Sequence, residues 1–435
     1  MPDNSQEKVG EVSVSQETAD LTKKSVKNIG GLERIIESTL GADTSRLIES
    51  LLLGGIYLEA SDLHFEPGKT KTKIRARIDG VLQNVTDIEN SYHNILLSRI
   101  KLLSGLKINV GDRPQDGRFS VVLKEGPVEI RTSTLPAEYG EAIVLRILNP
   151  KTLLSLEELG VRKDLLDILK TEVKRPNGMI IVTGPTGSGK TTTLYSFLNV
   201  LQRPEIKIIT IEDPIEYHIQ GISQTQVNPA GGYDFASGLQ SIMRQDPDVI
   251  LVGEIRDAKT CQIALQSALT GHLVFTTLHT NDAAGTIARL TSLGGDLKNI
   301  GPAVNLAIAQ RLVRRVCPAC GKLEPILSEA LVKMKKILAG LPKEISVPQI
   351  KKGLRAPVAK GCKACNNTGY KGRIGIFEIL LIDEEIERFI IKNPSIADLR
   401  ERAIEKGMVT IEQDGVIKVL TGLTTIEELE REIGF

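Results

Sequence analysis

The sequence predicts an α/β fold built on a parallel sheet, with a smaller α+β domain before it and a helical C-terminus from residue 386. From residue 178 onward, short apolar runs alternate with helical segments, which is typical of a parallel sheet covered by helices. The first apolar run, 179–182, leads into a glycine-rich loop and then into a helical segment at 192–201.

The glycine-rich loop has the spacing of a phosphate-binding P-loop. It consists of Gly184, Pro185, Thr186, Gly187, Ser188, Gly189, Lys190 and Thr191, and Thr192 follows it. Glycines let successive N–H groups point at one anion, and the helix N-terminus adds partial positive charge. Lys190 can then reach the β- and γ-phosphates of a nucleotide, and the Thr191 hydroxyl can hold Mg²⁺. The alternative, a glycine-rich turn without a ligand, is disfavoured by the strand before the loop and the helix after it.

Three further strands are predicted at 207–212, 249–253 and 273–278. In an open parallel sheet, ligands bind at the carboxyl ends of the strands. Glu212 ends the first of these strands, where it could orient or deprotonate a water that attacks the γ-phosphate. Glu254 follows the second strand in the manner of a Walker B acid, so we expect it to hold magnesium, through a water molecule.

The third strand carries a histidine at each end, His272 and His279. Isolated histidines at strand ends usually have no catalytic role. Here Thr, His and Asn side chains cluster at 276–281, which favours a phosphate-sensing role for this pair.

The five cysteines predict metal binding or burial, because the chain shows no secretion signal that would favour disulfides. Cys317 and Cys320 form one C-x₂-C pair, and Cys362 and Cys365 form a second. Four thiolates can close a tetrahedral Zn²⁺ site with no open position, so we expect structural zinc rather than redox chemistry. Cys261 stands alone in a helical segment and is expected to be a buried small residue.

Composition divides the chain into four parts. Residues 1–30 are polar and are expected to form a disordered tail. Residues 31–149 mix helical and strand patterns, as in an α+β domain, and 150–176 form a linker with prolines at its ends. Residues 177–435 form the α/β domain, which includes the tetracysteine insertion at 316–366.

Arginine alternates with apolar residues along the strands of the α+β domain. One face of its sheet is therefore expected to carry Arg75, Arg77, Arg131 and Arg146. A solvated basic face and a set of arginines aimed at phosphate are equally compatible with this spacing.

Charge and composition restrict the possible partners. Lys and Arg number 55, Asp and Glu number 54, and aromatic residues make up only 3%, which counts against binding nucleic acid through bulk charge or base stacking. No apolar run approaches the ~18–20 residues of a membrane span. We therefore expect a cytoplasmic protein with no transmembrane segment of its own, and peripheral attachment to a membrane complex remains open.

Taken in order, these motifs resemble the secretion ATPase superfamily of bacterial type II secretion and type IV pilus assembly. The motifs are the box at 61–67, the P-loop, the acidic box at 211–216, the box at 253–257, and the two histidines. The resemblance runs from about residue 45 to the end, and the tetracysteine insertion is similar to that of the secretion and pilus-extension branch. It implies a PAS-like domain joined to a RecA-like ATPase domain. The sequence departs from many extension ATPases in one respect, because we expect their large N-terminal module to be missing here or reduced to the tail.

The resemblance also implies a cytoplasmic homohexamer, peripheral to the inner face of the cell membrane. Its hydrolysis of ATP with Mg²⁺ would drive pilus or pseudopilus assembly through an inner-membrane platform protein. By position, Glu212 is the general base and Glu254 the Walker B acid. Arg131 and Arg146 match the family arginines that reach the γ-phosphate, and Arg244 is a further candidate, whereas Gln240 stands where some relatives have another arginine.

Two other function classes remain as alternatives. A P-loop nucleic-acid translocase is disfavoured by the neutral charge and the scarcity of aromatic residues. A nucleotide-binding regulator without turnover is disfavoured because Lys190, Thr191, Glu212 and Glu254 occur together.

Overall fold

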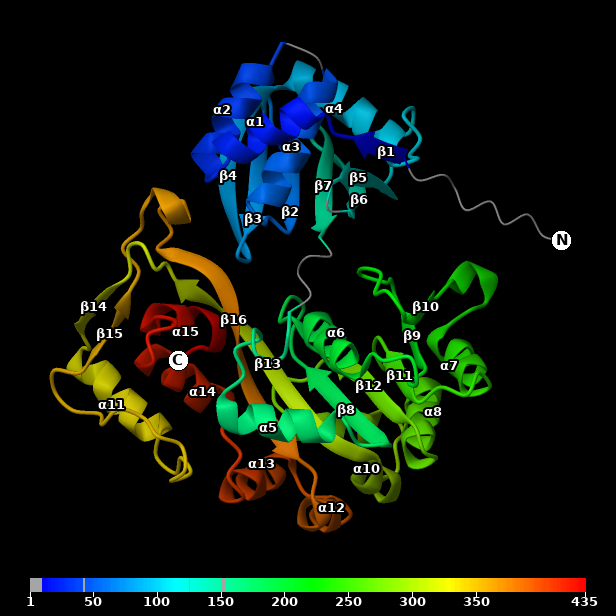
Figure 1. The fold of residues 1–435 in the computed structure, drawn as a ribbon, viewed down its shortest axis with the longest axis vertical. Coiled ribbons are helices and arrows are strands. Elements are labelled where there is room, and N and C mark those ends of the chain that lie inside the picture. The colour runs from blue at the N-terminus through cyan, green and yellow to red at the C-terminus, as the bar shows by residue number, and fades with distance from the viewer. Residues whose placement is uncertain (1–9, 42–43, 125, 150–153) are drawn as a thin grey trace. The chain divides into compact units, whose positions relative to one another are not determined.

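The computed structural model describes residues 10–41, 44–124, 126–149 and 154–435, and the chain divides into two compact units (Figure 1). Unit 1 comprises residues 1–151, 317–320 and 360–371, and unit 2 comprises 152–316, 321–359 and 372–435. The cysteine-bearing segments therefore belong to unit 1, whereas the sequence analysis counted them within 177–435. None of the described helices combines the length and apolar character that a membrane span requires.

Unit 1 is built on a seven-stranded sheet in the order β1-β5-β6-β7-β2-β3-β4. Its strands are β1 (Gly10–Ser13), β2 (Asp62–Pro67), β3 (Lys71–Ile78), β4 (Val81–Glu89), β5 (Gln115–Leu123), β6 (Gly126–Ala137) and β7 (Gly140–Leu148). One face packs against the helices α2 (Ile29–Thr39), α3 (Thr44–Tyr57) and α4 (Asn90–Leu103), and α1 (Gln16–Ser25) packs against α2 and α3. The period-2 alternation in β2 and β3 produces this arrangement, because Phe65 and Ile74 enter the core while their sequence neighbours face away.

Part of the predicted disordered tail is ordered. β1 pairs in parallel with β5 and buries Val12. Ser15 caps α1 by accepting a hydrogen bond from the Thr18 N–H at 3.1 Å. A four-residue strand and a polar helix leave little apolar signal in the composition, so the sequence indicated disorder. Residues 1–9 of the predicted tail and 150–153 of the predicted linker lie outside the described residues.

A row of arginines crosses the polar face of the unit 1 sheet. Arg118 pairs with Arg131, Arg131 with Arg146, Arg146 with Asp62, and Asp62 with Arg77. Residues paired in this way point to the same face. This arginine row places four cations and one carboxylate on neighbouring strands, an arrangement that favours an anionic partner because like charges placed opposite each other repel.

Unit 2 is built on a second seven-stranded sheet, in the order β10-β9-β11-β12-β8-β13-β16. Its strands are β8 (Gly178–Thr183), β9 (Ile208–Glu212), β10 (Ser223–Gln226), β11 (Val249–Val252), β12 (Leu273–Leu278), β13 (Val304–Val316) and β16 (Tyr370–Leu381). The first six of these strands, in their sheet order, run parallel to their neighbours. The four strands that the sequence predicted in this region are confirmed as β8, β9, β11 and β12, with boundaries that differ by at most one residue.

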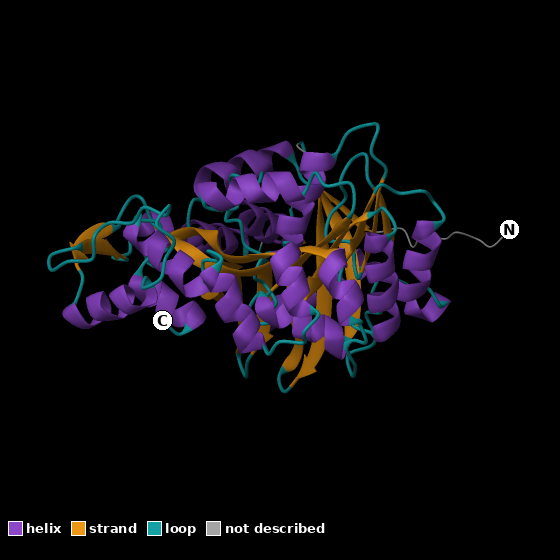
Figure 2. Ribbon diagram, turned by 90° about the horizontal axis from the view of Figure 1, so that it is seen from below, coloured by secondary structure: helices purple, strands orange, loops and turns teal. Residues whose placement is uncertain are grey.

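Helices lie on both faces of this sheet (Figure 2). Successive residues of β8 enter different cores, Met179 and Ile181 on one side and Ile180 and Val182 on the other. One core includes α5 (Lys163–Glu172) and α6 (Lys190–Leu201), and the other includes α7 (Phe235–Met243), α8 (Ala258–Leu269), α9 (Ala284–Ser292) and α10 (Leu297–Ala303). This double coverage explains the uninterrupted apolar run at 179–182.

The remaining elements follow β13. A two-stranded sheet pairs β14 (Lys322–Pro325) with β15 (Arg355–Val358), and α11 (Ser328–Ile337) lies between them in sequence. The chain then ends in α12 (Glu384–Ile390), α13 (Ile396–Glu405), α14 (Ile411–Leu420) and α15 (Ile426–Ile433). Short 3₁₀ turns occur at Pro229–Gly231 and Lys363–Cys365.

Candidate nucleotide-binding site

The glycine-rich loop joins β8 to α6, in the strand–loop–helix context that its spacing predicted. Gly184 and Gly189 have backbone φ angles of 150° and 86°. A Cβ atom at these two positions would lie 2.5 Å from the Gln310 carbonyl oxygen and 2.9 Å from the Gln310 Nε2, so the close approach of β13 requires glycine. Since α6 begins at Lys190, its first N–H groups point toward the loop.

Gln310, a buried residue of β13, fixes this loop and was missed by the sequence analysis. Its Nε2 donates to the Ser188 carbonyl oxygen at 2.8 Å, and its Oε1 accepts from the Thr193 hydroxyl at 2.7 Å. One side chain therefore holds both the loop and the first turn of the helix. Gln310 lies more than a hundred residues along the chain from the P-loop and belongs to no motif, so only the sheet order reveals it.

Lys190 lies within the loop. Its Nζ donates to the carbonyl oxygens of Gly184 at 2.9 Å and Pro185 at 3.1 Å. Burial lowers the pKa of Lys190, and the Glu254 carboxylate opposes this effect. The loop thus contains a cation that is partly removed from water. The attraction between this cation and a phosphate oxygen is stronger there than in bulk water.

Glu254, Arg256 and His279 lie together at the carboxyl ends of β11 and β12. Glu254 Oε1 is 2.5 Å from Arg256 Nη2, and Glu254 Oε2 is 3.7 Å from His279 Nε2. Burial and the Lys190 charge lower the pKa of His279, which favours a neutral imidazole near pH 7. These three residues and Lys190 form what we call the edge cluster.

Two threonine contacts hold the strands of the edge cluster together. The Thr277 hydroxyl donates to the Gly253 carbonyl oxygen at 2.7 Å. The Thr183 and Thr280 hydroxyl oxygens lie 2.8 Å apart. The turns that carry Lys190, Glu254 and His279 are thus fixed to one another by side chains of neighbouring strands.

Glu212 ends β9 and is only 3% exposed. The Tyr195 hydroxyl donates to its Oε2, and Thr210 Oγ1 and Gln224 Nε2 donate to its Oε1 at 2.5 Å and 3.2 Å. Burial raises the pKa of Glu212, and these donors oppose the rise by stabilising the ionised form. The acid predicted as general base is therefore held by hydrogen bonds rather than directed into open water.

The structure does not bring His272 to the edge cluster. Its main-chain oxygen accepts from the Gly178 N–H at 3.2 Å, at the start of β8, whereas the P-loop follows the other end of that strand. Its ring Nδ1 lies 3.1 Å from the Ser267 carbonyl oxygen. Because the whole of β12 separates the two histidines, His272 and His279 lie at opposite ends of that strand, and only His279 lies in the edge cluster.

The predicted arginines occupy two different places. Arg131 and Arg146 belong to the arginine row of unit 1, where Arg146 Nε lies 3.1 Å from Asp62 Oδ1 and Arg131 Nε lies 3.5 Å from Glu129 Oε1. Arg244 caps the C-terminus of α7 in unit 2, and its guanidinium donates to the Gln240 carbonyl oxygen at 3.1 Å.

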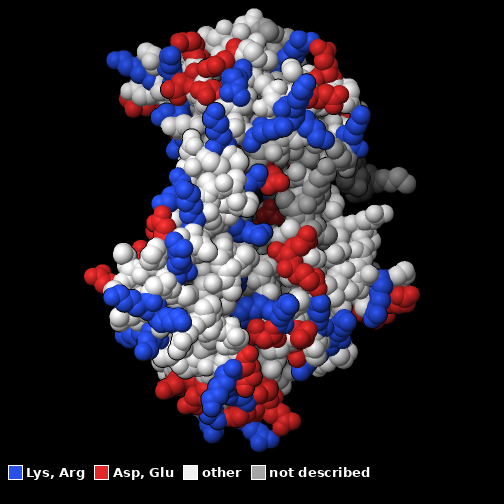
Figure 3. All heavy atoms as spheres, turned by 60° about the vertical axis from the view of Figure 1, so that its left-hand side comes forward, with Lys and Arg blue, Asp and Glu red and all other residues white. Residues whose placement is uncertain are grey.

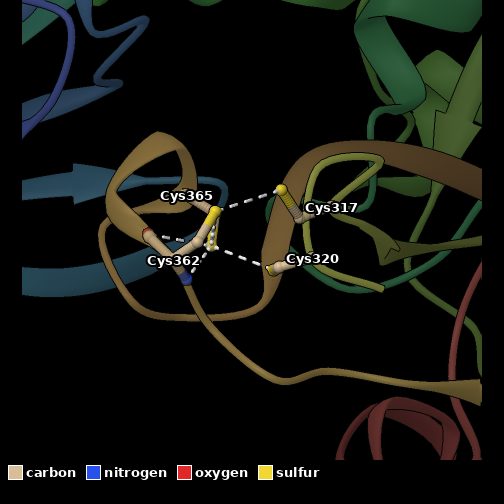
Figure 4. Close-up of side chains that lie close together, drawn as sticks. All are labelled: Cys317, Cys320, Cys362 and Cys365. Carbon is tan, nitrogen blue, oxygen red and sulfur yellow. Dashed lines mark hydrogen bonds between the residues drawn. The ribbon is translucent and has the colours of Figure 1, made fainter. Parts of the chain in front are cut away.

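The four predicted zinc ligands converge in unit 1 (Figure 4). The sulfur atoms of Cys317, Cys320, Cys362 and Cys365 all lie within 4.8 Å of one another. The Cys317–Cys362 and Cys320–Cys365 sulfur distances are 4.0 and 3.8 Å. A tetrahedral zinc site with Zn–S bonds of about 2.3 Å requires sulfur separations of about 3.8 Å, so this donor set fits zinc. Cys261, by contrast, is buried in α8, as expected.

The loop after Cys365 contacts the start of α2, within unit 1. Asn366 Oδ1 accepts from the Ile29 N–H at 2.7 Å, and Asn28 Nδ2 donates to the Lys363 carbonyl oxygen at 3.3 Å. Asn366 therefore caps a free N–H at the first turn of α2. A residue next to a cysteine of this cluster thus helps to fix the first turn of an N-terminal helix.

Comparisons with known proteins identify chains of similar sequence. The family model described as "Type II/IV secretion system protein" matches residues 40–431. The type II secretion system protein E of Dickeya dadantii is 44% identical over 89% of this chain and 75% of its own length. The type IV pilus assembly ATPase PilB of Myxococcus xanthus is 39% identical over 94% of this chain and 71% of its own length.

A solved structure extends the comparison to the fold. The crystal structure of the pilus retraction motor PilT with bound ADP aligns with a TM-score of 0.57 and 27% identity, over 87% of this chain and 94% of the other. The α/β ATPase fold is therefore shared. Because the family model matches residues 40–431, which are most of this chain, the chain belongs to the type II/IV secretion system protein family.

Proposed function

We propose that this protein hydrolyses ATP and uses the released energy to drive assembly of a type IV pilus, or of a pseudopilus in type II secretion. The observation that carries the proposal is the edge cluster, in which a P-loop lysine, an acid and a histidine meet at the carboxyl edge of a parallel sheet. The names of the relatives point to the same two machines.

The first proposed step is phosphate binding. The loop from Gly184 to Thr191 surrounds the phosphates with N–H groups, and Lys190 exchanges its carbonyl partners for phosphate oxygens. Mg²⁺, when bound, would neutralise charge on the phosphates. The Thr191 hydroxyl and the Glu254 carboxylate are the oxygen donors that would hold it.

The second proposed step is attack by water. Glu212 orients this water and takes its proton as the water oxygen bonds to the γ-phosphorus. The bond from that phosphorus to the β–γ bridging oxygen breaks, and ADP leaves. Arg256 and His279 fix the carboxylate of Glu254. We assign the phosphate-sensing role to His279, since His272 lies at the other end of β12. Removing or adding a γ-phosphate would change the charge that faces His279 and Lys190.

We further infer that the protein acts as a cytoplasmic homohexamer, peripheral to the inner face of the cell membrane, with an inner-membrane platform protein as its partner. Unit 1 would be the PAS-like domain and unit 2 the RecA-like domain of the family. Arg131 and Arg146 would reach the γ-phosphate, and Zn²⁺ would be held by the four cysteines. The arginine row supports the proposed contact of Arg131 and Arg146 with the γ-phosphate, because it concentrates positive charge at paired positions.

A P-loop nucleic-acid translocase is the alternative. On the face drawn in Figure 3, Lys and Arg side chains are interspersed with Asp and Glu. The balanced totals of 55 and 54 charged residues agree with this picture. A translocase is expected to carry a basic surface that tracks the phosphate backbone.

An ATPase assay of the full-length protein with Mg²⁺, in the presence and absence of single-stranded DNA, tests the proposal. We expect hydrolysis that rises with protein concentration, as hexamers form, and that changes less than about twofold with DNA. Strong stimulation by DNA would favour the translocase instead.

A further inference from the structure

We propose that Tyr195 is a positioning residue for Glu212, and that its hydroxyl aims the carboxylate at the attacking water. This inference rests on the proposed function, because it assigns a partner to the proposed general base. Nothing in the motifs of the sequence singles out Tyr195.

Tyr195 connects two parts of the site that the sheet keeps apart. In the strand order, β11 and β12 lie between β9, which ends in Glu212, and β8, which leads into the P-loop. Tyr195 stands on α6, four residues after Thr191, and side chains with this spacing share one helix face. Its hydroxyl bond to Glu212 therefore links the helix that begins in the P-loop directly to the acid on the far strand.

Burial makes this bond important. The Tyr195 side chain is 0% exposed, and water cannot replace its hydroxyl. A buried carboxylate needs donors for both oxygens. Thr210 and Gln224 both serve Oε1, and among the described residues only Tyr195 donates to Oε2. Without this hydroxyl, one oxygen of Glu212 would lack its donor and the carboxylate could rotate away from its aligned position.

The same bond supports the ionised form of Glu212, which a general base requires. Two effects oppose ionisation of Glu212, because burial and the nearby Glu216 charge both raise its pKa. The two other titratable side chains that face Glu212 are those of Tyr195 and Tyr217. Both phenols stay protonated because burial raises their pKa values. Loss of the Tyr195 hydroxyl would therefore leave Glu212 easier to protonate.

Tyr217 provides a matched control. Its ring packs edge-on against the Tyr195 ring, with centroids 4.7 Å apart and an interplanar angle of 85°. Its hydroxyl is buried, and no hydrogen-bond partner for it occurs among the described residues. Both tyrosines fill the same core, but only one of them bonds to the acid.

The test compares Tyr195→Phe with Tyr217→Phe in the full-length protein with ATP and Mg²⁺. We expect Tyr195→Phe to lower kcat at least about tenfold, while KM and ATP affinity change less than about twofold. The acid limb of its kcat profile should move to higher pH, because Glu212 loses a donor. Tyr217→Phe should retain the wild-type kcat and pH profile, and thermal unfolding checks that both variants are folded.

A double-mutant cycle with Glu212→Gln separates positioning from general destabilisation. In the Glu212→Gln background, Tyr195→Phe should change the residual kcat less than about twofold, because the group that it positions has lost its function. Equal losses in both backgrounds, or wild-type kcat and pH profile in Tyr195→Phe, would overturn the role of Tyr195 alone. A wild-type protein that does not hydrolyse ATP would instead overturn the proposed function, and this role with it.

Discussion

His279 Nε2 lies 3.7 Å from Glu254 Oε2, although the two residues follow different strands of the unit 2 sheet. The hydroxyl contact of Thr277 with the Gly253 carbonyl holds these strand ends together. Glu254 also faces Arg256 and lies close enough to Lys190 to affect its pKa. The Glu254 carboxylate therefore interacts with Lys190 of the P-loop, with Arg256, and with the histidine that we propose as a phosphate sensor.

Replacing Glu254 by glutamine should abolish ATP turnover and leave ATP binding nearly intact. The amide keeps the shape of the side chain but removes the charge that balances Lys190 and Arg256, and it is a poor magnesium ligand. We expect kcat to fall by at least about 10²-fold, which can be measured by phosphate release alongside a nucleotide-binding titration. Glu205→Gln, on an exposed turn, is the matched control. Wild-type turnover in Glu254→Gln would remove Glu254 from the site.

Gln310→Ala should weaken nucleotide binding although it changes no residue of the P-loop itself. The change leaves the Ser188 carbonyl and the Thr193 hydroxyl without their buried partner, at a cost of about 1–3 kcal/mol. Part of that cost should appear as a KM for ATP raised about tenfold, since the loop loses its support. Gln266→Ala, on the exposed side of α8, should leave KM unchanged. Equal KM values for the two variants would show that Gln310 does not support the loop.

The cysteine cluster should contain about one zinc ion per chain in freshly reduced protein, as measured by elemental analysis. Cys362→Ser should lose the metal. Because Asn366 caps α2 next to Cys365, a proposed zinc ligand, hydrogen exchange at Ile29 should speed up in the same variant. Asn366→Gly should speed exchange there but retain zinc, since glycine suits the left-handed backbone at this position. Protein without metal would contradict the site, and unchanged exchange in Cys362→Ser would separate the metal from the α2 cap.

Buried His93 predicts a loss of stability in mild acid. Burial lowers its pKa from the ordinary value of about 6.5, and its Nε2 lies 2.8 Å from the Glu141 carbonyl oxygen. The unfolded chain therefore binds this proton more readily than the folded chain, so stability falls as pH drops below about 6.5, by up to about 1.4 kcal/mol per pH unit. His93→Asn has no charge to gain, so its unfolding free energy, measured by urea titration from pH 7.5 to 5, should depend less on pH. Identical pH slopes would contradict this assignment.

The sequence predicted the parts of the site that local spacing determines. Gly184 to Thr191 have a turn-and-helix geometry that their own residue types impose, and the apolar runs at 208–212 and 249–252 carry their acids to one edge by strand polarity alone. The paired C-x₂-C motifs were likewise sufficient to predict the cysteine cluster.

Other features depend on contacts between distant segments. Gln310 and Tyr195 resemble ordinary strand and helix residues until the sheet order places them against the P-loop and Glu212. His272 satisfied the local pattern, but it lies at the opposite end of β12 from the edge cluster. The composition of residues 10–13 does not indicate a strand. This strand is stabilised by its pairing with β5, a contact with a distant segment.

ATP hydrolysis by the purified full-length protein, compared with that of Lys190→Ala, tests the central claim most directly. The account predicts Mg²⁺-dependent phosphate release by the wild type, and a loss of at least about 10²-fold in kcat/KM in the variant, because the loop loses the cation that faces the phosphates. Hydrolysis at the wild-type rate by Lys190→Ala, or no nucleotide binding and hydrolysis by the assembled wild type, would contradict it.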